Sequence, residues 1–233
     1  MMRTRTGIAT LLLVIASGLF GCKKDSDAEP SDLGISYFPV AVGSWVEYQV
    51  DSIWRDDEFN IHDSVSYRML ERISEEYLDP EGRPSQRIKR FVKDENDEWV
   101  VRDVWTATRS NTAAERTEEN KRRLKLSFPT RNARKWDINV YNTDDELEVA
   151  FREVDRAYAL NGMAFDSTLL VRNTLPPNQV VKRNFEERYA RHVGMIEKYW
   201  EETNTQTVYN PGQPPQVTVR GFRLDMAAVA YGN

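Results

Sequence analysis

The residue best suited to covalent chemistry is Cys22, which carries the only thiol of this 233-residue chain. An uncharged, largely apolar run from Ile8 to Phe20 precedes it, and Arg3 and Arg5 precede that run. A positive segment, a short apolar segment and a small residue, in that order, form a secretory signal peptide. The run is shorter than the ~20 apolar residues that a membrane-spanning helix needs. The sequence therefore predicts export, with residues 1–21 as the signal peptide.

The residues at the expected cleavage point, Leu19-Phe20-Gly21-Cys22, resemble the lipobox of bacterial lipoproteins. This resemblance implies that Cys22 becomes the N-terminus and carries a diacylglyceryl group, which would anchor the protein to the outer membrane. An ordinary signal peptide followed by an incidental cysteine is the alternative. Polar, aperiodic residues come next, so we interpret residues 22–36 as the lipidated cysteine and a flexible tether.

Asp25 and Asp27 resemble the surface-export signal of Bacteroidota-type lipoproteins, in which acidic residues closely follow the acylated cysteine. A simple soluble spacer explains the same residues equally well. The mature protein is therefore expected to face either the periplasm or the cell exterior.

Composition restricts the possible partners. Removal of Arg3 and Arg5 with the signal peptide changes the net charge from −5 to −7. An acidic balance argues against nucleic acid as a partner and against electrostatic binding to anionic lipid. Lipidation of Cys22 would leave no thiol for a disulfide. The remaining ~200 residues are enough for one domain, which we place at residues 37–233.

Apolar residues alternate with polar ones through most of the expected domain, and this period of two predicts β-strands. Asn161-Gly162, between two alternating runs, is a strong hairpin signal. The stretch Glu146–Leu160 also fits a helix, but the adjacent hairpin favours two strand pieces joined at a bulge. The residues expected on the inner face of the sheet are Val46, Tyr48, Val50, Val65, Tyr67, Met69, Phe165, Leu169 and Val171, and Trp54 shares the parity of Val46, Tyr48 and Val50.

Two further segments are less regular. Leu124, Leu126 and Phe128 alternate and predict a strand, whereas the charged residues 113–123 permit either a helix or a strand. Another short strand is expected through Trp136 and Val140. Together the runs predict an all-β protein with a single antiparallel, strongly curved sheet of about ten strands, shaped as a half-barrel or barrel.

Four sequence blocks resemble a group of uncharacterised Bacteroidota-type lipoproteins. The blocks begin at Tyr37, Ser127, Tyr158 and Tyr189, and they cover most of the mature chain. The resemblance implies a curved antiparallel sheet, similar in broad terms to half-barrel lipoprotein carriers. It implies no catalytic residue.

Residues for other chemistry are poorly placed. His62 and His192 are far apart and lack a His or Cys partner at metal-ligand spacing, so no metal is expected. Asp166 and Ser167 are adjacent on an expected strand and would point to opposite faces. Nucleophile elbows and phosphate-binding loops are absent from the sequence, so we predict no catalytic residue and no cofactor.

These observations lead to three hypotheses. The first is a non-enzymatic scaffold or binding module that acts on an envelope protein or glycan. The second is a carrier that shelters an acyl chain or another apolar ligand inside the curved sheet. The third is a glycan-active enzyme with a spatial pair of carboxylates, which a sequence does not reveal. A sheet interior filled by its own side chains favours the first hypothesis, whereas a cavity favours the second.

Overall fold

The computed structural model describes residues 32–176, 178 and 180–233. The signal peptide, Cys22 and most of the expected tether lie outside these residues. The described chain forms one sheet, preceded by a short 3₁₀ helix, η1 (Ile35–Tyr37). The strands are β1 (Trp45–Asp56), β2 (Ile61–Leu78), β3 (Pro84–Lys93), β4 (Trp99–Arg109), β5 (Ala113–Glu118), β6 (Lys121–Ser127), β7 (Lys135–Asp137), β8 (Glu148–Leu160), β9 (Met163–Asn173), β10 (Val181–Ala190), β11 (Gly194–Val208) and β12 (Gln216–Gly232).

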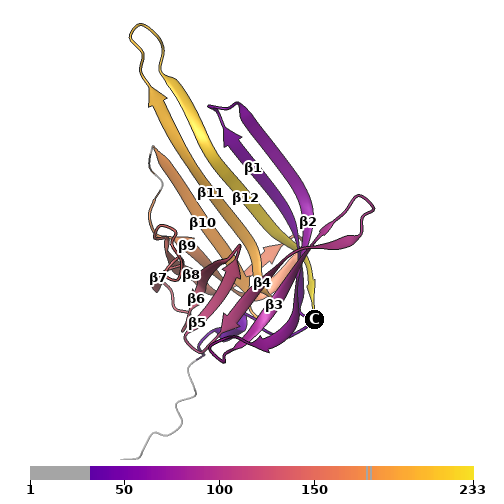
Figure 1. Cartoon of the computed structure of the whole chain (residues 1–233). Coiled ribbons are helices and arrows are strands. Elements are labelled where there is room, and N and C mark those ends of the chain that lie inside the picture. Colours follow the sequence, from indigo (N-terminus) through magenta and orange to yellow (C-terminus); the bar gives the residue numbers. More distant parts are fainter. Residues whose placement is uncertain (1–31, 177, 179) are drawn as a thin grey trace, which may run out of the picture. The chain divides into compact units, whose positions relative to one another are not determined.

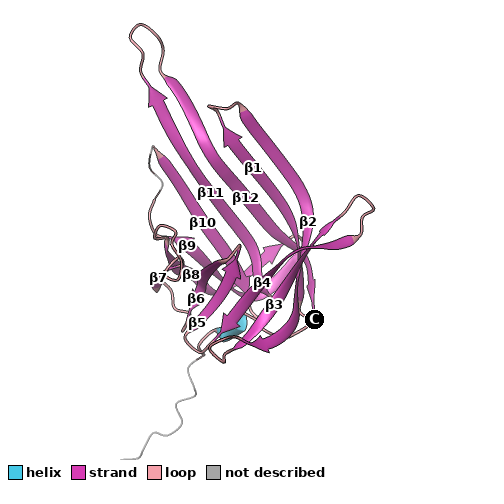
Figure 2. Ribbon diagram, in the orientation of Figure 1, coloured by secondary structure: helices cyan, strands magenta, loops and turns pink. Residues whose placement is uncertain are grey.

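The sheet consists of two consecutive meanders, and every pairing in it is antiparallel (Figures 1 and 2). Strands β1 to β6 form one meander and β7 to β12 form the other, and pairing of β1 with β12 joins them. The prediction of a single, strongly curved antiparallel sheet is therefore confirmed, with twelve strands instead of about ten. Among the described residues, no helix has the length and hydropathy required to span a bilayer.

The two edge strands, β6 and β7, approach each other and nearly close the sheet into a barrel. The backbone N–H of Leu124 donates to the carbonyl oxygen of Ile138 at 2.9 Å, and the Trp136 indole N–H donates to the Leu124 carbonyl, also at 2.9 Å. Asn142 adds a bond from its side-chain amide to the Arg122 carbonyl. These bonds satisfy part of the backbone that an open sheet edge would leave unpaired.

Most of the expected inner-face residues are in the core. Seven are less than a tenth exposed, and they are Val46, Tyr48, Val50, Met69, Phe165, Leu169 and Val171. Each strand places alternate side chains on the concave side of the curved sheet, so apolar residues from both meanders meet there.

Val65 and Tyr67 lie on the predicted face but, like Trp54 on the same face, are not fully buried. The ends of β1, β2, β11 and β12 extend beyond the barrel (Figure 1), and we call residues 51–56, 61–66, 201–208 and 216–225 the projecting sheet. Trp54 and Val65 belong to it and remain 42% and 55% exposed. Tyr67, next to it, is only partly buried. Alternation correctly predicted their face, but within residues 32–176, 178 and 180–233 no second layer covers it.

The opposite end of the barrel is capped by the residues that precede β1. The Thr130 N–H donates to the Leu33 carbonyl, the His192 N–H donates to the Ser36 carbonyl, and Tyr37 is fully buried. Asp32 forms an ion pair with Arg191 at 2.7 Å. The folded unit therefore begins before the boundary that we predicted at residue 37, because residues 32–36 already contact the sheet.

The two segments for which the sequence also permitted a helix, residues 113–123 and 146–160, form strands. β8 is a strand, as favoured, and its pairing with β9 is irregular around Glu153 and Asp155, which both have positive φ. Asn161 and Gly162 form the expected β8–β9 turn, with φ of 50° and 80°. Residues 113–123 form most of the β5–β6 hairpin. The strand expected through Val140 is shorter than predicted, since β7 ends at Asp137 and Val140 is 54% exposed.

Candidate functional site

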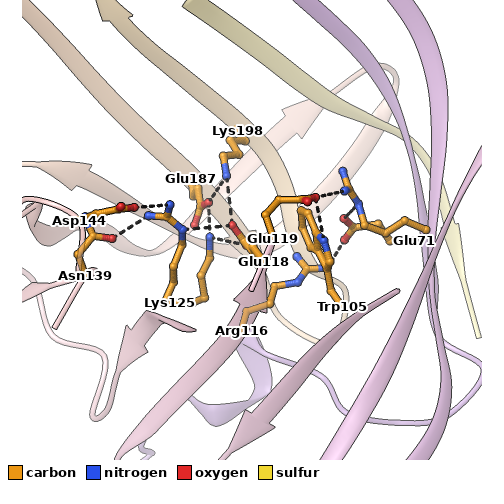
Figure 3. A network of polar contacts seen from close by, with 12 residues as sticks. Glu71, Trp105, Arg116, Glu118, Glu119, Lys125, Asn139, Asp144, Glu187 and Lys198 are labelled. Carbon is orange, nitrogen blue, oxygen red and sulfur yellow. Dashed lines mark hydrogen bonds and ion pairs between the residues drawn. The ribbon is translucent and has the colours of Figure 1, made fainter. Parts of the chain in front are cut away.

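Charged side chains cross the interior of the barrel, although the sequence led us to expect an apolar inner face. We call this cluster the interior ion network (Figure 3). Its members come from six strands of both meanders and are each less than a tenth exposed. They are Glu71, Arg90, Arg116, Glu118, Lys125, Glu187 and Lys198.

One half of the network is centred on Glu71 of β2. Its carboxylate accepts hydrogen bonds from Arg90 of β3, at 3.1 Å, and from Arg116 of β5. The Arg90 guanidinium also lies 3.6 Å from the centre of the Trp105 ring and pairs with Asp103 at 3.1 Å. Since β2 and β5 are not neighbours in the sheet, the bond between Glu71 and Arg116 spans the concave side.

The other half is centred on Glu187 of β10, whose side chain is fully buried. Lys125 of β6 donates to it at 2.6 Å, Lys198 of β11 lies at 3.1 Å, and the Tyr189 hydroxyl donates at 2.6 Å. Lys125 also donates to Glu118 of β5 at 3.1 Å. Lys125 thereby connects the two meanders through the interior of the barrel.

A β-bulge directs Lys125 inward. The pairing of β5 with β6 shifts between Ala114, which faces Leu126, and Glu115, which faces Leu124, so Lys125 has no cross-strand partner. An extra residue of this kind reverses the alternation of a strand. Leu126 is fully buried while Leu124 is only partly buried, so the continuous alternation predicted through Leu124 is wrong.

The network lowers the pKa of two of its carboxylates, Glu118 and Glu187. Burial alone would raise the pKa of Glu118, but Lys125, Lys198 and Arg116 outweigh burial and hold that pKa well below its usual range. The pKa of Glu187 is lowered in the same way, against its own burial, chiefly by Lys125 and Lys198. Burial and the nearby Lys125 lower the pKa of Lys198.

These pKa directions argue against acid catalysis by this carboxylate pair. A glycosidase acid needs a raised pKa so that it holds a proton at neutral pH, whereas Glu118 and Glu187 have lowered pKa values. Both carboxylates are also bonded to buried cations and are closed to a substrate. We interpret the network as an internal cross-link that fixes the curvature of the sheet.

A small cavity lies between the interior ion network and the capped end of the barrel, and Glu71 and Arg116 of the network line it. It has a free volume of about 70 Å³, bounded by Phe38, Tyr48, Ile88 and Met195 among others. Gln86 Oε1 and Arg116 Nε are buried there without a protein hydrogen-bond partner. The space suits about five water molecules and is far below the roughly 300–1,000 Å³ of small-molecule pockets. The closed part of the barrel is therefore largely filled.

The larger hollows open on the concave side toward the projecting sheet. One has a volume of about 550 Å³ and combines the aromatic residues Trp200 and Phe222 with charged residues such as Arg123 and Asp144. The rings of Trp200 and Phe222 lie edge to face at 5.3 Å, and Phe222 is directly opposite Trp54 on β1. A second hollow of about 580 Å³ adjoins β2.

The structure does not bring the histidines together. His62 lies near the β1–β2 turn, 3.6 Å from Asp57, whereas His192 is in the β10–β11 turn at the opposite end of the barrel. The Ser167 hydroxyl bonds with Tyr37 and Asp155 and not with its neighbour Asp166. Within residues 32–176, 178 and 180–233, no cluster of three or more His, Cys, Asp or Glu side chains is suitable for a metal.

The positions of the network residues in the sequence explain why these charges were expected at the surface. Glu71, Lys125 and Glu187 all lie within runs of strongly alternating residues. Polar side chains in such runs usually indicate a solvated face, so the runs did not predict charges inside the barrel.

Comparison of the chain with models of protein families, with curated proteins and with solved structures gave no match.

Proposed function

We propose that the protein is a non-enzymatic, lipid-anchored binding module of the bacterial cell envelope, attached to the outer membrane through Cys22. Its predicted signal peptide and lipobox support the anchor. Two observations support a binding module over a carrier: the cavity of about 70 Å³ in the closed part of the barrel is too small to enclose an acyl chain, and the hollow of about 550 Å³ is open and lined mostly by polar and charged residues.

One spatial relationship carries the proposal. Asp32, where the tether joins the described domain, pairs with Arg191 in the β10–β11 turn. The projecting sheet leads to the β11–β12 turn, at the other end of β11. An anchor that precedes Asp32 therefore holds the capped end toward the membrane, and the open concave surface points away from it.

The projecting sheet is suited to contact with a partner. Its concave face carries Trp54 and Val65 as well as the partly buried Phe222, and exposed apolar groups that gather on one face are typical of interaction sites. The charged groups Arg183 and Glu202 line the same hollow as Phe222. An aromatic centre with a polar rim is the composition of a specific interface.

Site-specific photocrosslinking in intact cells tests the proposal. A photoreactive amino acid at position 54 faces the concave side, and the same amino acid at position 53 faces the opposite side of β1, where Ile53 is similarly exposed at 45%. We expect a discrete crosslinked product from position 54 and not from position 53. Equal products from both positions, or none, would contradict a concave binding surface.

Mass spectrometry of the purified full-length protein separates the binding module from the carrier. We expect no stoichiometric apolar ligand other than the acyl groups on Cys22. A bound fatty acid or lipid that is released only when the sheet is unfolded would favour the carrier instead.

A further inference from the structure

The projecting sheet has a free strand edge on β2. β2 pairs with β1 continuously from Ile61 to Arg72, but with β3 only from Met69 onward. Figure 1 shows the β3–β4 hairpin turning away from the sheet above this point. Among the described residues, no strand pairs with residues 61–68 on the side away from β1.

This edge has few of the features with which proteins usually block such edges, since its charged side chains are limited to Asp63 and Arg68. A free edge presents a row of backbone N–H and C=O groups that can pair with another chain, and lysine, proline or a bulge commonly prevents this. Residues 61–68 contain no lysine or proline, and their register with β1 has no shift. Eight extended residues are long enough for a full strand pairing.

A hollow of about 580 Å³ lies beside the free edge on the concave face. Its apolar walls are Val65, Tyr67 and Val92, and its basic groups are Lys93 and Arg102. Arg102 donates to the Tyr67 hydroxyl at 3.0 Å and lies 3.7 Å from Asp103 Oδ2, but its side chain is about half exposed, so part of its guanidinium faces the open hollow and can bind an anion.

We infer that this edge binds an extended segment of a partner protein as an added strand, with apolar and acidic side chains together on the face that enters the hollow. The inference rests on the proposed function and names its partner class. The unpaired backbone requires a polypeptide, because only another strand supplies donors and acceptors at the same repeat. Side chains of one parity enter the hollow, where apolar groups contact Val65 and Tyr67 and acidic groups meet Lys93 and Arg102.

The probe for this inference is the capped, dye-labelled octapeptide Thr-Glu-Thr-Val-Thr-Val-Thr-Glu, in which valine and glutamate share one face of the strand, added to the full-length protein in detergent. We expect saturable binding and slower amide hydrogen exchange across residues 61–68. The same peptide with its two central valines replaced by proline has fewer backbone donors and should not bind.

Matched variants locate the contact. Val65→Asp places a carboxylate in the hollow and should weaken peptide binding by about tenfold or more, through lost apolar contact and repulsion. Ser64→Asp adds the same charge on the opposite face of the same edge and should change binding by about twofold or less. Arg102→Ala should weaken binding of the acidic peptide, and the weakening should diminish at high salt.

The outcomes are decisive. Absence of binding at millimolar peptide, or binding without protection of residues 61–68, overturns the inference. A dimer of the protein that Val65→Asp dissociates, without peptide binding, shows that a second copy occupies the edge and also overturns it. If the position-54 crosslink forms and the peptide does not bind, this inference alone fails. If the peptide binds and the crosslink is absent in cells, the proposed function fails.

Discussion

Lys125 Nζ lies 2.6 Å from Glu187 Oε1, and these two side chains are 1% and 0% exposed. The residues are 62 positions apart in the chain and belong to different meanders of the sheet. Removal of two charges from water is costly, and the cost is offset only when every charge has a close partner. The pair therefore requires the curvature that brings β6 and β10 together, and in return it favours that curvature.

The first prediction concerns Glu187→Gln. The substitution keeps a hydrogen-bonding group but leaves Lys125 and Lys198 with less negative charge around them. Breaking a buried ion pair from one side typically costs about 3–5 kcal/mol. We expect a loss of this size in the free energy of unfolding, measured by urea denaturation of the full-length protein with tryptophan fluorescence.

Glu186→Gln is the matched control, because Glu186 is the preceding residue of β10 and pairs with Arg172 near the surface. Surface ion pairs contribute about 0–1 kcal/mol, so this variant should unfold almost as the wild type does. Equal effects of the two substitutions would show that the interior ion network does not stabilise the fold.

The second prediction concerns pH. The pKa values of Glu118 and Glu187 are lowered in the folded protein, so the folded state binds fewer protons than the unfolded state in acid. Their contribution is fully present above the unfolded carboxyl pKa of about 4.3 and is lost as pH falls below it. The urea midpoint should therefore decrease steeply below about pH 4.3 in the wild type. The decrease should be shallower in Glu187→Gln, and an identical pH profile would contradict this interpretation.

The third prediction compares two tyrosines that the sequence places on the same face. Tyr48 is 2% exposed and its hydroxyl donates to the Met195 carbonyl at 2.7 Å, whereas Tyr67 lies beside an open hollow. Tyr48→Ala should cost about 3–5 kcal/mol of unfolding free energy, as large aromatic truncations in cores do. Tyr67→Ala should cost much less. Similar costs for the two would mean that the hollow is closed in solution.

The fourth prediction concerns the anchor. One acyl chain holds a protein only weakly at a membrane, and two or more hold it firmly. Cys22→Ser should therefore give an unprocessed precursor or a soluble product in cell fractionation. A variant that is processed and remains in the membrane fraction like the wild type would contradict the lipoprotein assignment.

The fifth prediction concerns orientation at the outer membrane. If the acidic tether directs surface export, protease added to intact cells should degrade the wild-type protein. Replacement of Asp25, Asp27 and Glu29 by alanine should then protect it. Protection of the wild type itself would indicate a periplasmic location and would make the tether a simple spacer.

The local pattern of the sequence determined the secondary structure. Alternation in residues 45–54 and 63–77, and the hairpin at Asn161-Gly162, were sufficient because side-chain direction in a strand depends only on parity and turns depend on a few residues. The same reasoning resolved Glu146–Leu160 in favour of a strand. It also predicted the curved sheet, since so many short antiparallel strands must curve to cover an apolar face.

Only the tertiary structure decided which parts of the inner face are covered and what fills them. Tyr48 and Trp54 have the same parity, but one lies inside the closed barrel and the other beyond its rim, because strand length relative to the barrel is a property of the whole sheet. The contact between Lys125 and Glu187 depends on a one-residue bulge and on near closure between β6 and β7. Their partners come from distant strands, so no local pattern distinguishes these buried charges from solvated ones.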